Sequence, residues 1–140
     1  MTDTSYKYSQ LQKFALTVAS FGLAIFVVLT AMGAHALKEV LENPDYNRVF
    51  SAATRHLMLG SIGIFVIVLL SNILTLNPKI PLVLMLLGLL FFSFNLLLYF
   101  FLKINGISLS FLGILAPIGG IMFTAAWLWF GIMIAKSKIK

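Results

Sequence analysis

Both histidines and three of the four acidic residues of this chain lie between positions 33 and 56. On a helix, His35 and Glu39 would share one face, because residues four apart are neighbours there. Together with His56 they could bind a metal ion, although a catalytic zinc usually has three protein ligands. A second option is acid–base chemistry, in which His35 acts as a general base while Arg55 holds an anionic head group.

Neither chemistry is supported by a further motif. No serine or threonine nucleophile is marked by its neighbours, and the chain has no cysteine. A simpler interpretation is that His35, Arg55 and His56 bond helix ends, lipid phosphates or each other at a membrane surface. Lys38 would pair with Glu42 along a helix. We therefore predict no catalytic residue, no metal site and no cofactor, and we favour a protein that is not an enzyme.

The elements that must position these residues are membrane helices. Hydrophobic residues make up 61% of the chain and charged residues 10%, against about 45–50% and about 25% in soluble domains. A soluble protein of 140 residues with this composition would expose large apolar patches. The net charge of +6 comes from basic residues scattered at the ends of apolar runs. We therefore predict the lipid bilayer as a partner and exclude nucleic acid.

Apolar segments of about 20 residues are long enough to span a bilayer, and four segments qualify. They cover about residues 14–36, 57–76, 80–102 and 107–135. Only short links follow the second and third segments, so neighbouring helices must be antiparallel. The sequence predicts an all-α integral membrane protein, a single domain over residues 1–140 with four transmembrane helices in an antiparallel bundle.

The longer connection between the first and second spans predicts an amphipathic interfacial helix. Asn43 precedes Pro44 and should end the first helix, and Asp45 is suited to cap a new one. Apolar residues then recur at helical spacing: Tyr46, Val49, Phe50 and Ala53. This helix is expected to lie at the membrane surface and to run into the second span.

Three features inside the spans are candidates for packing or binding. Asn95 should point into the bundle, either to hold helices together or to line a ligand cavity. Pro117 lacks a backbone donor and is expected to kink the last helix. A full break there, with Gly119 and Gly120 beside it, would free carbonyls for ion binding. Small residues at a spacing of four form a packing stripe: Ala116, Gly120 and Thr124.

Basic residues near the span ends predict the orientation in the membrane. Six lysines belong to the side that holds both termini: Lys7, Lys13, Lys79, Lys136, Lys138 and Lys140. Four basic residues belong to the other side: Lys38, Arg48, Arg55 and Lys103. This majority predicts cytoplasmic N- and C-termini in a bacterial plasma (inner) membrane.

Four segments in this order resemble a known family. They read GAHALKEVL, VFSAATRHLML, FFSFNLLLYF and LGILAPIGGIMFTAAWLWF. They are similar to the small inner-membrane proteins catalogued as domain of unknown function 423, whose animal members are called transmembrane-protein-256-like. The strongest motifs are Gly33–Ala36 and Pro117–Gly120, and the resemblance covers roughly Phe14–Met133. It implies a four-helix membrane protein and brings no settled activity, substrate or cofactor.

We therefore expect a small integral membrane protein without identifiable catalytic activity, with an accessory, assembly or envelope-associated role. Its protein partner would be another membrane protein or further copies of the chain. One alternative is an oligomer through which small solutes or ions permeate. Another is an interfacial lipid-modifying enzyme that uses His35. The candidate functional residues are Gly33, His35, Lys38, Arg55, His56, Asn95, Pro117, Gly119 and Gly120.

Overall fold

The computed structural model describes residues 8–137, and every regular element in that range is helical. The first helix, α1, covers Gln10–Ala34 and begins at a capping box. The Ser9 hydroxyl accepts a hydrogen bond from the backbone N–H of Gln12 at 3.2 Å, and the Gln12 side chain accepts one from the Ser9 N–H at 2.7 Å. These bonds satisfy two of the backbone donors that a helix start leaves unpaired.

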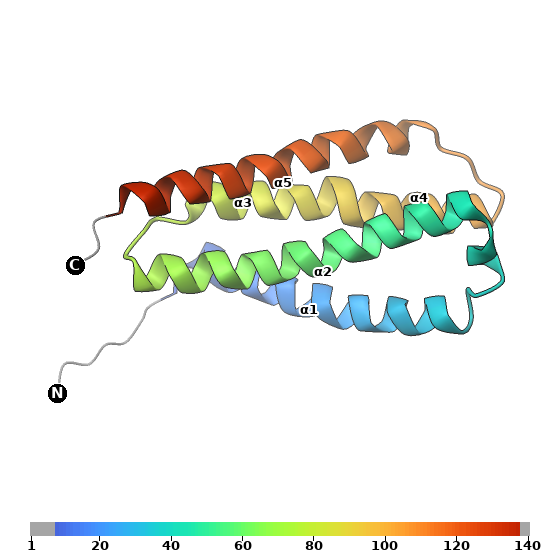
Figure 1. Cartoon of the computed structure of the whole chain (residues 1–140), viewed down its shortest axis with the longest axis horizontal. Helices are drawn as coiled ribbons and strands as arrows, with labels where there is room; N and C mark the ends of the chain where they lie inside the picture. Colours follow the sequence, from blue (N-terminus) through green and yellow to red (C-terminus); the bar gives the residue numbers. More distant parts are fainter. Residues whose placement is uncertain (1–7, 138–140) are drawn as a thin grey trace.

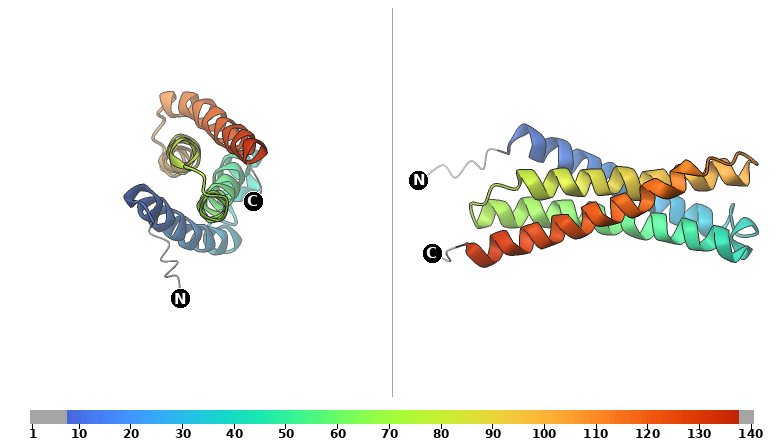
Figure 2. Two further views of the ribbon diagram at one scale, coloured as in Figure 1. Left: turned by 90° about the vertical axis from the view of Figure 1, so that its left-hand side faces the viewer. Right: turned by 90° about the horizontal axis from the view of Figure 1, so that it is seen from above.

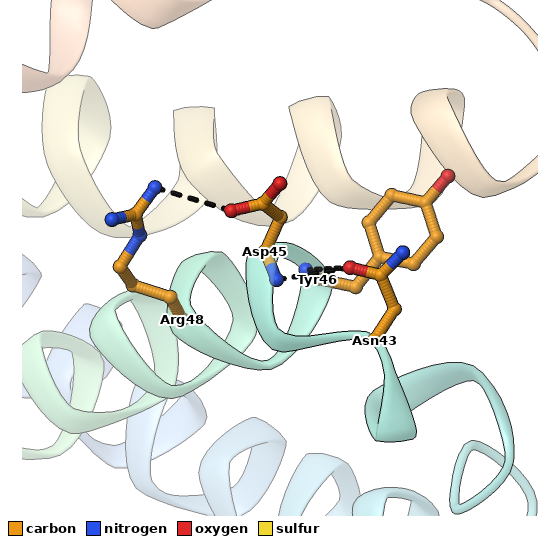
Figure 3. A network of polar contacts seen from close by, with 4 residues as sticks. All are labelled: Asn43, Asp45, Tyr46 and Arg48. Atoms are coloured by element: carbon orange, nitrogen blue, oxygen red, sulfur yellow. Dashed lines mark hydrogen bonds and ion pairs between the residues drawn. The ribbon is translucent and has the colours of Figure 1, made fainter.

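The second helix, α2, covers Pro44–Ile73 and follows a short 3-10 turn, η1, at Val40–Glu42. Its N-cap is Asn43, whose side-chain oxygen accepts from the backbone N–H groups of Asp45 and Tyr46 (Figure 3). The predicted cap at Asp45 is therefore wrong. The Asp45 carboxylate instead pairs with Arg48 at 3.3 Å in the first turn.

The segment predicted as an interfacial helix is the first part of α2, with no break before the second span. Its apolar residues pack inside the molecule. The ring of Phe50 lies 5.0 Å from the ring of Phe100, and that of Tyr46 lies 6.3 Å from the same ring. Phe100 belongs to α4 (Asn95–Ile104), so α4 covers this apolar side, and the segment runs alongside α4 as part of a helix 30 residues long.

The third span combines α3 (Lys79–Gly88), a π-helical turn η2 (Leu89–Phe94) and α4 (Asn95–Ile104). Its connection to the last helix turns at Gly106, which has a φ of +78°. Glycine adopts this left-handed conformation without strain, as the Asn-Gly pair predicts. The last helix, α5 (Phe111–Lys136), continues through Pro117, so it is not broken there.

Within residues 8–137 four helical segments are long and apolar enough to cross a membrane: Gln10–Ala34, Pro44–Ile73, Lys79–Ile104 and Phe111–Lys136. This confirms the all-α class and the expectation of four helices long and apolar enough to span a membrane, although the second helix begins at Pro44 and not near residue 57. Many large apolar side chains face outward, Val27, Leu59, Ile114 and Leu128 among them. Such a surface suits lipid tails.

Consecutive long helices run in opposite directions, so the described ends of the chain lie at one end of the molecule (Figure 1). The α1–α2 and α4–α5 connections lie at the opposite end. α2 packs against α1 on one side and against the third span on the other, while α5 packs mainly across the third span (Figure 2). α1 and α5 are therefore the outer helices, and α2 and the third span lie between them.

Candidate functional site

Glycines from three helices create the close contacts that hold α5 against its neighbours. A Cβ atom added at Gly119 would press on the backbone of η2, 2.7 Å from the carbonyl carbon of Phe91. A Cβ added at Gly60 of α2, or at Gly88 of α3, would lie 2.8 Å from the ring of Phe123. These positions have room only for a hydrogen atom, which lets α5 approach the π-helical turn closely.

His56 lies beside this close contact, three turns into α2, and is half-buried. Its ring centroid is 4.2 Å from that of Phe92 and 5.9 Å from that of Phe123. The Nδ1 atom is 2.9 Å from the carbonyl oxygen of Ala52. Because a carbonyl only accepts hydrogen bonds, Nδ1 carries the hydrogen in this contact, and in the neutral imidazole Nε2 is then the acceptor.

The His56 side chain borders a groove of about 580 Å³ between α2 and α5, which we call the α2–α5 groove. Its lining is His56, Pro117, Gly120, Ile121, Phe123, Thr124, Ala125 and Leu128. The hydroxyl in this lining, on Thr124, already donates to the Gly120 carbonyl at 3.0 Å. Among the residues that the structure describes, Nε2 of His56 has no hydrogen-bond partner, so it offers the groove a free acceptor.

The groove continues into an outward face of α5 that is rich in small residues. We call this face the outer stripe, and its members recur every three or four positions: Gly113, Pro117, Gly120, Thr124, Leu128 and Gly131. A Cβ atom added at Gly113 or Gly131 would meet nothing within 4 Å, and one at Gly120 would meet only the Phe92 ring, at 3.8 Å. The outer-stripe glycines are therefore not needed for packing within the chain.

A second groove lies on the other side of α2, where α2 packs against α1. This α1–α2 groove has a volume of about 350 Å³. Its lining is Phe26, Thr30, Leu41, Phe50, Ser51, Thr54, Arg55 and Met58. The Arg55 side chain is exposed, and it makes no ion pair within residues 8–137. Arg55 and His56 are neighbours in sequence, yet they border different grooves.

The other candidate residues of the charged stretch, His35, Lys38 and Gly33, do not line the groove of His56 or the groove of Arg55. His35 is exposed at the end of α1, and Lys38 is exposed in the turn that follows. Gly33 is partly buried, and a Cβ atom there would lie 3.1 Å from the Phe50 ring. Over residues 8–137, His, Asp and Glu side chains nowhere gather in a group of three that could hold a metal ion.

Asn95 is buried and lies at the start of α4. Its amide nitrogen donates to the carbonyl oxygen of Leu112 at 2.7 Å, which ties the first turn of α5 to α4. Pro117 is exposed on the outer stripe, and as a proline it contributes no backbone hydrogen-bond donor to α5. The geometry gives Asn95 a role in packing, whereas Pro117 and Gly120 face outward.

Sequence reasoning missed the aromatic side chains that support His56. Phe92 and Phe123 are two of thirteen phenylalanines in the chain, and nothing in their local sequence distinguishes them. The π-helical turn at Leu89–Phe94 was also missed, because no proline or glycine within it marks the change. Only the crossing of α5 over this turn makes the two rings meet the imidazole.

Comparison with known proteins gives one family and several relatives. Residues 29–120 match the family described as "Protein of unknown function (DUF423)". The chain is similar to a UPF0382 membrane protein of Staphylococcus epidermidis, with 34% identity over 98 residues, which cover 70% of this chain and 75% of that protein. A UPF0382 membrane protein of Staphylococcus haemolyticus gives the same identity and coverage. No solved structure matches the chain significantly.

Proposed function

The chain belongs to the DUF423 family, and the relatives that it matches are membrane proteins. From this premise we propose that it is an accessory subunit that binds a spanning helix of another membrane protein. The proposed binding surface is the outer stripe together with the α2–α5 groove. The observation that carries the proposal is the open space around Gly113 and Gly131, together with the absence of a close contact at Gly120, where a Cβ would meet only the Phe92 ring at 3.8 Å. In lipid, small residues on a helix face allow a second helix to approach closely.

The cost of these glycines supports a binding role. A glycine inside a helix destabilises it by about 0.5–1 kcal/mol relative to alanine. Gly119, Gly60 and Gly88 offset that cost through close packing within the chain, but the outer-stripe glycines make no such contact. If a helix of another protein packs along the outer stripe, its close contact with these glycines offsets their cost in the same way.

His56 indicates the chemistry of the partner. Its free Nε2 faces the α2–α5 groove and needs a hydrogen-bond donor once lipid or water is displaced. The outer stripe of a second copy would bring only the Thr124 hydroxyl, which is already used on the Gly120 carbonyl. We therefore favour a different protein, with an apolar spanning helix that carries one side-chain donor opposite His56.

We further propose how the molecule lies in the bilayer. The long helices form an antiparallel bundle across the bacterial inner membrane, with both termini in the cytoplasm. From Arg55 to Ile73, α2 rises about 27 Å at roughly 1.5 Å per residue, and the hydrocarbon is ~30 Å thick. His56, the next residue, contacts Phe92 near the middle of the third span, so Arg55 lies inside the edge of the hydrocarbon and its long side chain extends toward the head groups. The first turns of α2, from Pro44, lie at the interface. A phosphatase that works only outside the cytoplasm should be inactive when fused after Lys140.

The permeation alternative has less support. It was motivated by Asn95 and by a break at Pro117, but the Asn95 amide donates within the chain and α5 is continuous. The enzyme alternative needs His35 near a second reacting group, and His35 is exposed at the end of α1. We therefore favour the accessory role over both.

The proposal is tested by filling the groove. Gly120→Leu should leave the fold intact, because a Cβ at Gly120 would meet only the Phe92 ring at 3.8 Å and the rest of the side chain would occupy the α2–α5 groove. Wild-type chain purified in mild detergent at native expression level should carry one other membrane protein at fixed stoichiometry. After both are purified, the variant should bind that protein at least about tenfold more weakly, a loss of about 1.4 kcal/mol.

Ala24→Leu is the matched control, because Ala24 is exposed on α1, the outer helix that does not form this groove. It should bind the partner like the wild type. An assembly that contains only copies of this chain would contradict the proposal, as would full binding by Gly120→Leu.

A further inference from the structure

We propose that the α1–α2 groove is a binding site for an anionic phospholipid. Arg55 would hold the phosphate, and the apolar wall of the groove would hold the upper part of an acyl chain. This inference rests on the proposed placement of the helices in a bilayer, but it does not depend on a partner helix at the outer stripe.

The first argument is the difference between the two exposed arginines of α2. Arg48 pairs with Asp45 at 3.3 Å, one turn away on the same helix (Figure 3). Arg55 makes no ion pair within residues 8–137 and lines the α1–α2 groove, whereas Arg48 is not part of the lining of that groove. A guanidinium has five N–H donors in a fixed fork that fits phosphate oxygens two at a time.

The second argument is that the other polar groups of the groove have no hydrogen atom to offer. The Thr30 hydroxyl donates to the Phe26 carbonyl at 2.8 Å, and the Ser51 hydroxyl donates to the Asn47 side chain at 2.9 Å. Thr54 likewise donates to the carbonyl one turn before it, at 2.9 Å. Arg55 is thus the available side-chain donor of this lining, so the ligand must present acceptors, and an anion suits a guanidinium best.

The third argument is that apolar residues of the groove lie on the membrane-centre side of Arg55, where the acyl chain follows the phosphate of a lipid. Arg55 and Ser51 line the part nearer the start of α2, together with the apolar Leu41 and Phe50, and the Arg55 side chain extends toward the head groups. Phe26 and Met58 also line the groove, and each lies about one turn nearer the middle of the membrane than Thr30 and Arg55 respectively. A phospholipid whose phosphate contacts Arg55 would therefore place its acyl chain against Phe26 and Met58.

Net charge separates anionic from zwitterionic lipids. A zwitterionic head group carries its own cation next to the phosphate, which weakens its attraction to a second cation. The head group of phosphatidylglycerol is anionic and has no such cation, so the guanidinium neutralises it directly. The site should prefer phosphatidylglycerol to phosphatidylcholine with the same acyl chains.

The experiment titrates these two lipids into the full chain in a non-ionic detergent and counts bound lipids by native mass spectrometry. Wild type should bind phosphatidylglycerol at least about tenfold more tightly than phosphatidylcholine, and added salt should reduce this preference. Arg55→Gln should abolish the preference. Because Arg55 is exposed and makes no ion pair within the described residues, its replacement should not change the far-UV spectrum or the melting temperature.

Arg48→Gln is the matched control, since it removes the same charge from the same helix outside the groove. It should keep the preference, and so should Gly120→Leu, which separates this site from the proposed partner surface. Equal affinity of the wild type for both lipids would overturn the inference. So would an unchanged preference in Arg55→Gln, or an equal loss in Arg48→Gln.

Discussion

Gly119 and Gly120 are neighbours in α5, but they have opposite surroundings. Gly119 is buried against the backbone of the π-helical turn, where even one methyl group would collide. Gly120 faces the α2–α5 groove, and a methyl group there would meet only a ring edge at 3.8 Å. The inner face of α5 thus uses glycine to pack within the chain, whereas its outer face has glycine without an internal reason.

The same contrast separates Arg55 from His56 on α2. Successive residues of an α-helix point about 100° apart, so one side chain reaches the groove beside α1 and the next reaches the groove beside α5. A cluster of candidate residues in the sequence therefore becomes two sites with different chemistry. One offers the guanidinium of Arg55, and the other offers the imidazole of His56.

The largest effect is expected at the inner face of α5. Gly119→Ala would place a methyl group against the backbone of Phe91 and Phe92, which cannot move as a flexible side chain could. Overpacking of this kind typically destabilises a protein by about 1–3 kcal/mol, and we expect the upper end here. Unfolding by SDS in mixed micelles, followed by far-UV circular dichroism, measures the change in free energy. A variant as stable as the wild type would show that the inner face is not tightly packed.

A smaller effect is expected from the hydrogen bond that joins α4 to α5. Asn95→Leu keeps a similar volume but removes the donor to the Leu112 carbonyl. Hydrogen bonds between membrane helices contribute on the order of 1 kcal/mol, and the same unfolding assay should show a loss of that size. If the variant is instead equally stable or more stable, Asn95 is not holding the start of α5, and a binding role for its amide regains support.

The smallest effect on stability is expected at the outer face. Gly120→Ala has space for its methyl group and removes the flexibility of glycine, so it should leave stability unchanged or raise it by up to about 1 kcal/mol. The measurement is the same unfolding assay, run beside Gly119→Ala. Destabilisation as large as that of Gly119→Ala would remove the distinction between the two faces of α5.

The sequence predicted four long apolar helices, and it could do so because lipid imposes a simple requirement. Each crossing segment must be long, apolar and helical, so composition and length reveal it. The Asn-Gly turn before α5 was also readable, since left-handed backbone at Gly106 favours glycine. Local signals were weaker at α2, where a proline and a capping residue predicted an interfacial helix but could not show that α4 covers its apolar side.

The sequence identified individual candidate residues, but it did not show which of them lie together in one site. The motif Pro117–Gly120 is recognisable in the sequence, yet it contributes Gly119 to the inner face and Pro117 and Gly120 to the outer face of one helix. Nothing in the motif says which glycine meets another helix. The aromatic support of His56 comes from two other helical segments, so no local pattern could reveal it.

The sequence by itself determined that this protein consists of apolar helices joined by short connections, because those properties follow from lipid as the surrounding solvent. The tertiary structure decided which sides of the helices meet, through the π-helical turn and the glycines that let α5 cross it. Helical spacing groups residues by face, but only the crossing of two helices determines whether a face is packed within the chain or left for a ligand. That physical distinction separates Gly119 from Gly120, and Arg55 from His56.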